Sequence, residues 1–342
     1  MKKILDKISH IERSSLILVV LFVLVLVAMI CLNPSQFATI GNFRNIMLQI
    51  AENGCFAAAY FLVFVCGGFN FACVMIGNLA GIVLAVICSI PSLQAVMSQE
   101  MLLIFGIFIA IIVGLLCGGM MSFFVYKFKI PPLMVTICAS KLFEGIGFIL
   151  TKGQSALAPS IVTKLGAMDF FGVIPILIVV MLACFVICDV FLRKTRMGRQ
   201  ARLYGLNKEA NRYSGISNAK TLATVYMLSG ILSAVGGMMV LSKFGSVKPD
   251  YGTTLTSTII LIVMLSGITI GSGNESVLSV LLALITIQLL SSGFAIGGIN
   301  ANVTTFLYGT LLLIVVFLTT KGYEKLAFYQ RWAKQRGKLV AG

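Results

Sequence analysis

The sequence predicts an all-α polytopic membrane protein with about ten transmembrane helices, and its composition is the first observation behind this prediction. Of the 342 residues, 59% are hydrophobic and only 11% are charged, and the mean hydropathy is +1.03. A soluble domain carries about 25% charged residues because its surface faces water. With so few charges, the outer surface of this chain must face lipid.

Long apolar runs are the second observation. About 20 helical residues cross the hydrocarbon core of a bilayer, and a helix satisfies its backbone hydrogen bonds internally. Prolines fall at the edges of the runs, where they break no hydrogen-bond ladder. Gly67 and Gly68 leave one boundary open, because they could mark a break within a longer membrane segment. The predicted spans are 16–32, 46–65, 73–90, 101–126, 133–150, 172–192, 219–242, 255–272, 276–293 and 301–320.

The distribution of positive charge is the third observation, and it predicts the orientation. With the N-terminus inside, the inner segments and Lys220 hold 20 of the 26 lysines and arginines, and the outer segments hold five. Lys141 lies within a span. The positive-inside rule therefore places both termini in the cytoplasm. The inner segments include a basic N-terminus at 1–15, a long loop at 193–218 and a basic tail at 321–342. The other inner segments are the short loops at 66–72, 127–132 and 273–275.

The first span needs separate justification because it follows four basic residues, as a secretory signal would. No small-x-small cleavage site follows it, so we interpret 16–32 as a retained span. The whole chain, 1–342, is then a single transmembrane domain. Three G-x-x-x-G pairs, beginning at Gly77, Gly114 and Gly293, are typical of close helix packing within such a bundle.

Several classes of function are excluded by residue type and spacing. Nine cysteines are scattered through apolar runs and His10 is the one histidine, so we expect no metal site. Cys184 and Cys188, one helical turn apart, are interpreted as packing residues. No phosphate-binding G-x-x-x-x-G-K-[ST] loop occurs, and the glycine-rich run from Gly267 to Gly273 lacks its lysine. No catalytic residues are expected, and the basic charges lie at the ends of spans, which argues against nucleic-acid binding.

Ionisable residues inside predicted spans are candidates for function because burying them is costly. Lys141 and Glu144 are three positions apart and can pair on one helix. They are either an internal ion pair or the polar lining of a solute path. Glu52 lies near the start of its predicted span, from where it can reach an interface.

The loop at 193–218 is the most informative segment. It is rich in basic residues and contains a stretch, Asn207 to Tyr213, that predicts a short helix ended by Ser214 and Gly215. One interpretation is a solvated loop that contacts anionic lipid head groups. The other is a helix lying flat below the membrane on which a soluble partner pushes.

This loop resembles a known family. MGRQARLYGLNKEANRYSGI at 197–216 is similar to the cytoplasmic coupling loop of ABC-importer permeases of the ribose, autoinducer-2 and galactose type. Three further motifs occur in the family's order, namely NFRNIMLQ at 42–49, IPPLMVT at 130–136 and LSGILSAVGG at 228–237. The resemblance covers essentially the whole chain.

The resemblance implies a type II-like importer permease bundle in a bacterial cytoplasmic membrane. Its partners would be a second permease subunit, identical or not, ATP-binding-cassette ATPases and an extracytoplasmic solute-binding protein. ATP and Mg would bind the ATPase, so this chain would hold no cofactor, and the solute would be small and polar, by analogy a sugar. The implied ATPase-coupling residues are Arg199, Arg202, Gly205, Asn207, Glu209, Ala210, Arg212, Ser214, Gly215 and Ile216.

Departures from the family pattern select the candidate path residues. Asn70 stands where the family usually has an acid, and Glu144 stands before Gly145 where an arginine is common. With Lys141, these residues are the candidate lining of the translocation path. Two other classes of function stay open at this point: an ion- or proton-coupled secondary transporter, and a membrane scaffold subunit that transports nothing.

Overall fold

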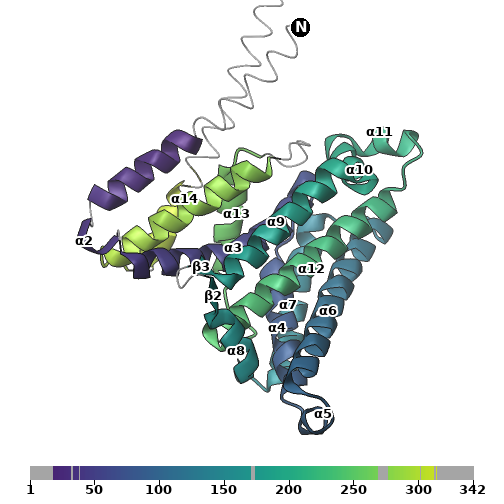
Figure 1. The fold of residues 1–342 in the computed structure, drawn as a ribbon. Helices are drawn as coiled ribbons and strands as arrows, with labels where there is room; N and C mark the ends of the chain where they lie inside the picture. The colour runs from purple at the N-terminus through teal and green to yellow at the C-terminus, as the bar shows by residue number, and fades with distance from the viewer. Residues whose placement is uncertain are drawn as a thin grey trace, which may run out of the picture.

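The computed structural model describes residues 18–31, 34–37, 39–170, 174–268, 276–300, 302–311 and 313. The predicted basic N-terminus (1–15), the basic tail (321–342), His10 and the inner loop at 273–275 lie outside these ranges. Within them the chain is almost entirely helical (Figure 1).

The helices follow one another with short connections. The first is Leu18–Cys31, and residues 302–311 form the last described helical segment. Between them lie α2 (Pro34–Phe37), α3 (Ile40–Val65), α4 (Cys73–Cys88), α5 (Pro91–Val96), α6 (Gln99–Lys127), α7 (Pro132–Thr151), α8 (Ser160–Ala167), α9 (Ile176–Lys194), α10 (Arg196–Leu206), α11 (Lys208–Tyr213), α12 (Asn218–Phe244), α13 (Leu255–Leu265) and α14 (Val277–Ile296).

The helices confirm an all-α polytopic membrane protein. Among the described residues, α3, α6, α7, α9, α12 and α14 are long and apolar enough to cross a membrane, and the first helix, α4 and α13 are shorter apolar helices. Each of the ten predicted spans overlaps a described helix. The number of membrane crossings and the orientation stay predictions.

The largest differences from the predicted span boundaries, among the described residues, are at α3 and α13. The α3 helix begins at Ile40 rather than 46, because the Thr39 hydroxyl accepts a hydrogen bond from the Asn42 N–H at 3.3 Å and caps it. The α13 helix ends at Leu265 rather than continuing toward 272. There the chain turns through Gly267, whose φ of +77° is accessible to glycine without strain.

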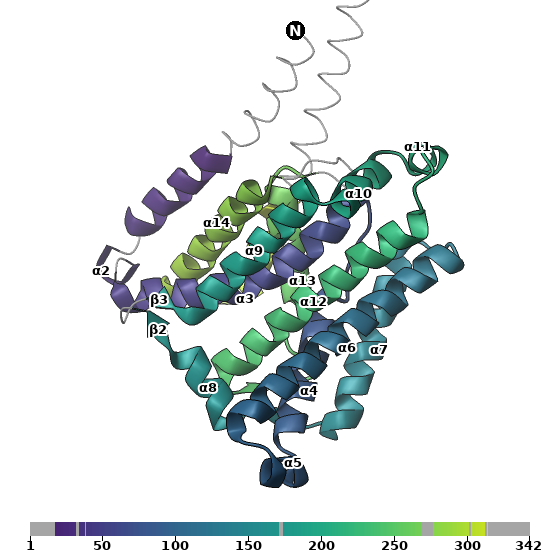
Figure 2. The same ribbon diagram turned by 45° about the vertical axis from the view of Figure 1, so that its right-hand side comes forward.

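The core is built around α12, which lies against α6, α4 and α3 (Figures 1 and 2). Glycines set the close approach of these helices. A Cβ atom at Gly237 would overlap the carbonyl group of Gly77 on α4, and one at Gly118 on α6 would overlap the Tyr226 carbonyl. Two of the three G-x-x-x-G pairs therefore pack helices within one bundle, as the sequence predicts.

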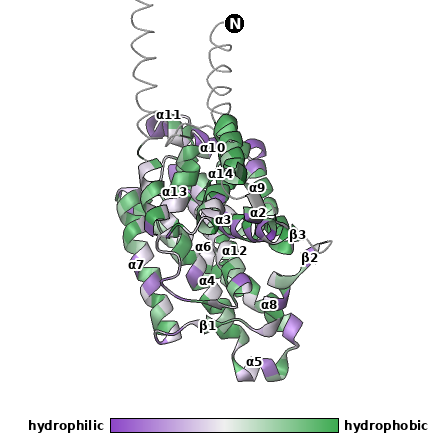
Figure 3. Cartoon of the chain, turned by 90° about the vertical axis from the view of Figure 1, so that its left-hand side faces the viewer, coloured by the Kyte–Doolittle hydropathy of each residue, from purple (hydrophilic) through white to green (hydrophobic). Residues whose placement is uncertain are grey.

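The two ends of the bundle carry different elements. The α10 and α11 helices lie at one end, and α5 and α8 at the other (Figure 1). Near α8, β1 (Ala156–Leu157) pairs antiparallel with β4 (Ser246–Val247), and β2 (Asp169–Phe170) pairs with β3 (Ile174–Pro175). Hydropathy colouring shows apolar helix sides and polar residues gathered at the α11 end (Figure 3).

Candidate functional site

The α10 helix is an amphipathic helix that the sequence prediction missed. Its N-terminus is capped by the Thr195 hydroxyl, which accepts from the Gly198 N–H at 3.0 Å. It packs through Gly198, Ala201 and Tyr204, which are buried at the spacing of one helix face. A Cβ atom at Gly198 would overlap the Phe191 carbonyl, so α10 touches the end of α9 directly. The capping threonine and the spacing of these buried residues are signals in the sequence that could have predicted α10.

Tyr204 anchors α10 against the end of the bundle. Burial raises the pKa of the Tyr204 hydroxyl to about 12, and the neighbouring Cys66 thiol and Tyr126 act in the same direction. The ammonium group of Lys208 lies 5.5 Å from the centre of its ring, within the range of a cation–π contact. Through this contact, the start of α11 is also held against Tyr204.

The α11 helix forms where the sequence predicts it. The Asn207 side-chain oxygen accepts from the N–H groups of Glu209 at 3.0 Å and Ala210 at 3.1 Å. The Ser214 hydroxyl donates to the Ala210 carbonyl at 3.0 Å, and Gly215 has a φ of +74°. These contacts fix both ends of a helix too short to be stable alone.

An amide pair fastens α11 to the start of α12. Asn211 is 2% exposed, and its side-chain N–H donates to the Asn218 side-chain oxygen at 2.8 Å. The Asn218 amide in turn donates to the Lys208 carbonyl at 3.3 Å. These bonds link α11 directly to the start of α12, the central helix of the core.

The predicted coupling residues gather on this α10–α11 surface. Arg199, Asn207, Glu209, Ala210, Arg212, Ser214 and Gly215 are exposed, whereas Arg202, Gly205 and Ile216 are half-buried. The prediction missed three large apolar side chains beside them: Leu203, Leu206 and Tyr213, which is 88% exposed. Apolar side chains ringed by arginines are typical of a protein contact surface.

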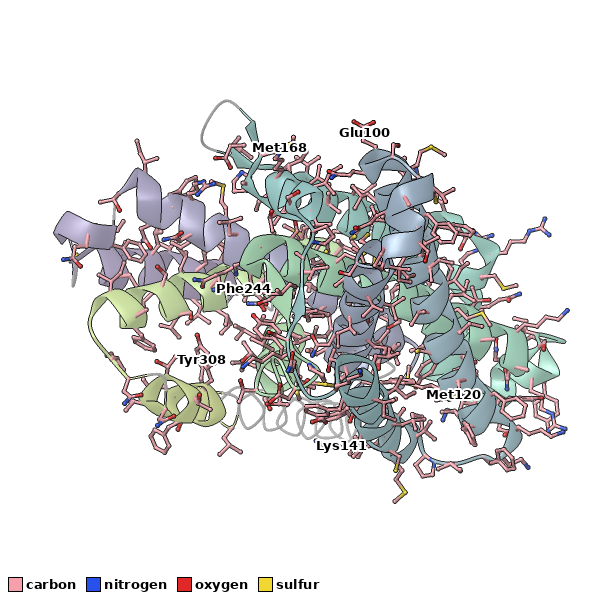
Figure 4. The ribbon with its side chains drawn as sticks, turned by 90° about the horizontal axis from the view of Figure 1, so that it is seen from below. Glu100, Met120, Lys141, Met168, Phe244 and Tyr308 are labelled. Carbon is pink, nitrogen blue, oxygen red and sulfur yellow. The ribbon has the colours of Figure 1, made fainter. Side chains whose placement is uncertain are left out.

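Lys141 and Glu144 form the predicted ion pair on α7. The Lys141 ammonium lies 2.7 Å from the Glu144 carboxylate, and the two side chains are 72% and 16% exposed. Lys141 stands near the middle of α7, where contact with lipid tails would be costly. Figure 4 shows Lys141 at the edge of the molecule, on the same side as Tyr308. The Lys141 ammonium therefore needs water or another protein beside it.

Asn70 occupies a different environment from this pair. It is fully buried in the turn between α3 and α4, and its side-chain N–H donates to the Ser229 hydroxyl at 2.8 Å. Its side-chain oxygen accepts from the Ala72 N–H at 3.2 Å, and Ser229 donates to the Ala59 carbonyl at 2.7 Å. These bonds join α3, α4 and α12 at the turn, and the structure does not bring Asn70 together with Lys141 and Glu144. A role for Asn70 in a path stays a prediction.

Glu52 lies in a buried charge cluster that the sequence does not reveal. It is 4% exposed rather than at an interface, because α3 begins earlier than predicted and places it midway along the helix. Lys243 binds its carboxylate at 2.7 Å, and the Tyr251 hydroxyl donates to it at 2.7 Å. Burial and the nearby carboxylate raise the pKa of Tyr251, so this hydroxyl stays a donor. No local spacing links these residues.

The buried cysteines contribute to packing. Cys184 on α9 lies 3.7 Å from Cys55 on α3, measured between their sulfur atoms, and Cys188 is fully buried one turn further on. None of the nine cysteines forms a disulfide. In the described part of the chain, no group of three or more histidine, cysteine or acidic residues gathers in a way that could hold a metal ion.

The described chain is a polytopic helical bundle with the α10–α11 surface at one end, which defines a multi-pass membrane protein. A family model described as "Branched-chain amino acid transport system / permease component" matches residues 42–316, and the chain belongs to this family. The protein is therefore an ABC-transporter permease, a membrane subunit of a transporter, and a multi-pass protein of the bacterial cytoplasmic membrane.

Two relatives illustrate the similarity. The chain is 30% identical over 238 residues to the Autoinducer 2 import system permease protein LsrD of Photorhabdus laumondii, covering 67% of this chain and 71% of that protein. It is 28% identical over 218 residues to LsrD of Escherichia coli K12, covering 62% and 66%. The resemblance to permeases of the autoinducer-2 type is thus confirmed. No solved structure matches the chain.

Proposed function

We propose that the chain is the transmembrane permease subunit of an ATP-driven importer that moves a small polar solute, a sugar or a sugar-like molecule, into the cell. The observation that carries this proposal is the α10–α11 surface, where basic and apolar side chains are exposed on a helix pair anchored by Tyr204 and Asn211. Closure of two partner ATPases would press on this surface. The spans would then alternate between outward and inward access.

The proposal includes ten spans with the α10–α11 surface and both termini in the cytoplasm. The 20-to-5 split of basic residues supports this orientation. Two of the five basic residues on the outer side are paired with acids in the structure: Arg44 with Asp169 at 3.0 Å, and Lys243 with Glu52.

The route of the mechanical signal follows from the contacts of α11. The Asn211–Asn218 pair ties α11 to α12, and α12 lies against α3, α4 and α6 over the length of the bundle. A push at the cytoplasmic end therefore reaches the helices of the core through one rigid element. Lys141 and Glu144, on the open side of α7, would line the path together with a second subunit.

The partners follow from this arrangement. A second permease subunit would complete the surface around α7, and the ATPases would bind ATP and Mg on the cytoplasmic side. A solute-binding protein would deliver the solute to the opposite end, where α5 and α8 lie (Figure 1). This chain would bind no cofactor of its own.

A charge exchange on α11 tests the proposal. The variant Glu209→Arg with Arg212→Glu keeps the net charge and an i, i+3 pair but reverses the pattern that an ATPase meets. In the reconstituted transporter, we expect solute-stimulated ATP hydrolysis to fall more than about 10-fold, the equivalent of one lost contact of about 1.4 kcal/mol. The measurement is hydrolysis by the co-purified ATPase with and without solute.

Lys220→Gln, on the first turn of α12 and exposed, is the matched control and should keep normal stimulation. Full stimulation in the charge-exchange variant would contradict the docking role. Solute uptake driven by membrane potential after ATP depletion would instead identify an ion-coupled transporter. An intact assembly that takes up no solute would identify a scaffold.

A further inference from the structure

A cleft lies between α13, α14 and residues 302–311, and no step of the coupling mechanism uses it. Its volume is about 660 Å³, within the range of sites that hold small molecules. Residues with hydroxyl side chains line it from all three segments, and these include Thr254, Ser257, Thr258, Ser291, Thr304 and Tyr308.

The chemistry of the lining is uniform. A hydroxyl group both donates and accepts hydrogen bonds and carries no charge. Among the described residues that line the cleft, none has a charged side chain. The remaining lining side chains, such as Leu261 and Ala295, are apolar. A site of this kind suits a molecule with many hydroxyl groups on an apolar carbon frame.

One hydroxyl in the cleft is poorly satisfied by the protein itself. The Tyr308 oxygen is shielded from solvent and faces the Ser291 hydroxyl without a well-formed hydrogen bond in the described part of the chain. A buried hydroxyl without a good partner costs free energy.

The position of the cleft agrees with a place on the solute's route. Thr254 precedes the first residue of α13, in the chain that follows β4 at the α5–α8 end of the bundle. Figure 4, seen from that end, shows Tyr308 on the same side of the molecule as Lys141. A solute arriving from this end can therefore meet the hydroxyls of the cleft before it reaches the opposite end.

We infer that this cleft is a binding site for an uncharged polyhydroxylated molecule of monosaccharide size. This inference rests on the proposed transport function and specifies where within one subunit the solute is held. A phosphorylated or carboxylated solute would be desolvated in the cleft without a lysine or arginine to pair with, which is strongly unfavourable. A lipid chain would leave the hydroxyls unsatisfied.

Removal of hydroxyls tests the inference in the complete reconstituted transporter. The triple variant Thr258→Val, Ser291→Ala and Tyr308→Phe keeps the shape of the cleft but removes three hydrogen-bonding groups. Because the solute would lose hydrogen bonds, the KM for uptake should rise at least about 10-fold. The probes are D-ribose, D-galactose and D-ribose 5-phosphate.

The control for this variant is Thr310→Val, on the same helical segment but outside the cleft, where the hydroxyl bonds only the Phe306 carbonyl. A normal KM in the triple variant would overturn the inference. Uptake of the phosphate ester but of neither neutral sugar by the wild-type transporter would overturn it as well. A wild-type assembly that transports no probe and shows no stimulated hydrolysis would instead contradict the proposed function itself.

Filling the cleft is an independent test. A Cβ atom at Gly309, which lines the cleft, meets no atom within 4 Å, and the same holds at Gly41 on α3. Gly309→Phe should therefore fold normally and reduce uptake at least 10-fold, whereas Gly41→Phe should leave it unchanged. Wild-type uptake by Gly309→Phe would overturn the inference. Loss of a co-purifying permease subunit would overturn it too, because the cleft would then be a subunit contact.

Discussion

The helices α12 and α7 have similar composition but face different surroundings. In the most apolar window of α12, 67% of the residues are buried within the chain, whereas the share for α7 is 28%. The α12 helix contacts α3, α4 and α6, whereas α7 packs mainly against α4. Apolar side chains of α7 such as Leu142 and Ile149 are exposed. One helix is the centre of the subunit and the other is at its edge.

The glycines of the two helices show the same contrast. Gly237 on α12 lies so close to Gly77 that no side chain fits between the two backbones, whereas a Cβ atom at Gly145 on α7 meets nothing within 4 Å. Glycine on α12 therefore permits helix contact. On α7, Gly145 leaves space that another molecule can occupy.

Each helix also contributes a lysine to an ion pair, and the pairs differ in exposure. The side chains of Lys243 and Glu52 are 14% and 5% exposed, whereas those of Lys141 and Glu144 are 72% and 16% exposed. The first pair is enclosed by its own subunit. The second pair needs water or another protein beside it, because lipid cannot solvate a charge. The comparison therefore supports the proposal that another component of the transporter lies against α7.

Bulky substitution of the glycines should produce the largest difference between the two helices. Gly237→Leu forces two backbones apart, which no change of rotamer can relieve, so we expect no folded protein in the membrane. Gly145→Leu should insert and fold as the wild type does. The measurement is the yield of monodisperse protein after detergent extraction. Equal yields from the two variants would contradict the packing of α12 against α4.

Removal of one charge from the buried pair should have the next largest effect. Glu52→Leu leaves Lys243 buried without its partner, at a cost of about 3–5 kcal/mol. The double variant Glu52→Leu with Lys243→Met removes both charges and should recover most of the lost stability. Apparent melting temperatures in detergent measure both. A single variant as stable as the wild type would show that Lys243 reaches water.

The parts of the site that the sequence predicted are those fixed by local contacts. The α11 helix depends on Asn207, Ser214 and Gly215, which act within a few residues of their targets, so its bounds could be read from the chain. The Lys141–Glu144 pair is likewise local. The long apolar runs predicted the membrane class for the same reason, because length and hydropathy are local properties.

The parts that the sequence did not predict depend on distant residues or on weak periodicity. Glu52 and Lys243 are 191 positions apart and meet only because α3 and α12 cross in the core. The α10 helix was missed because its apolar periodicity is weak and its arginines suggest a loop, although Gly198, Ala201 and Tyr204 mark its buried face. The hydroxyl cleft combines three helical segments, which no single motif represents.

Exchange of the exposed pair should have the smallest effect on stability and the most informative effect on function. The variant Lys141→Glu with Glu144→Lys keeps the attraction between the side chains, and an exposed pair contributes at most about 1 kcal/mol to folding. We therefore expect a melting temperature close to that of the wild type. Because the exchange reverses the charge on the open face of α7, we expect uptake to fall several-fold. Lys141→Met, which removes the exposed charge alone, is the control for stability. Normal uptake by the exchanged variant would show that the pair is only an ion pair within α7. The solute path would then lie on another face of the subunit.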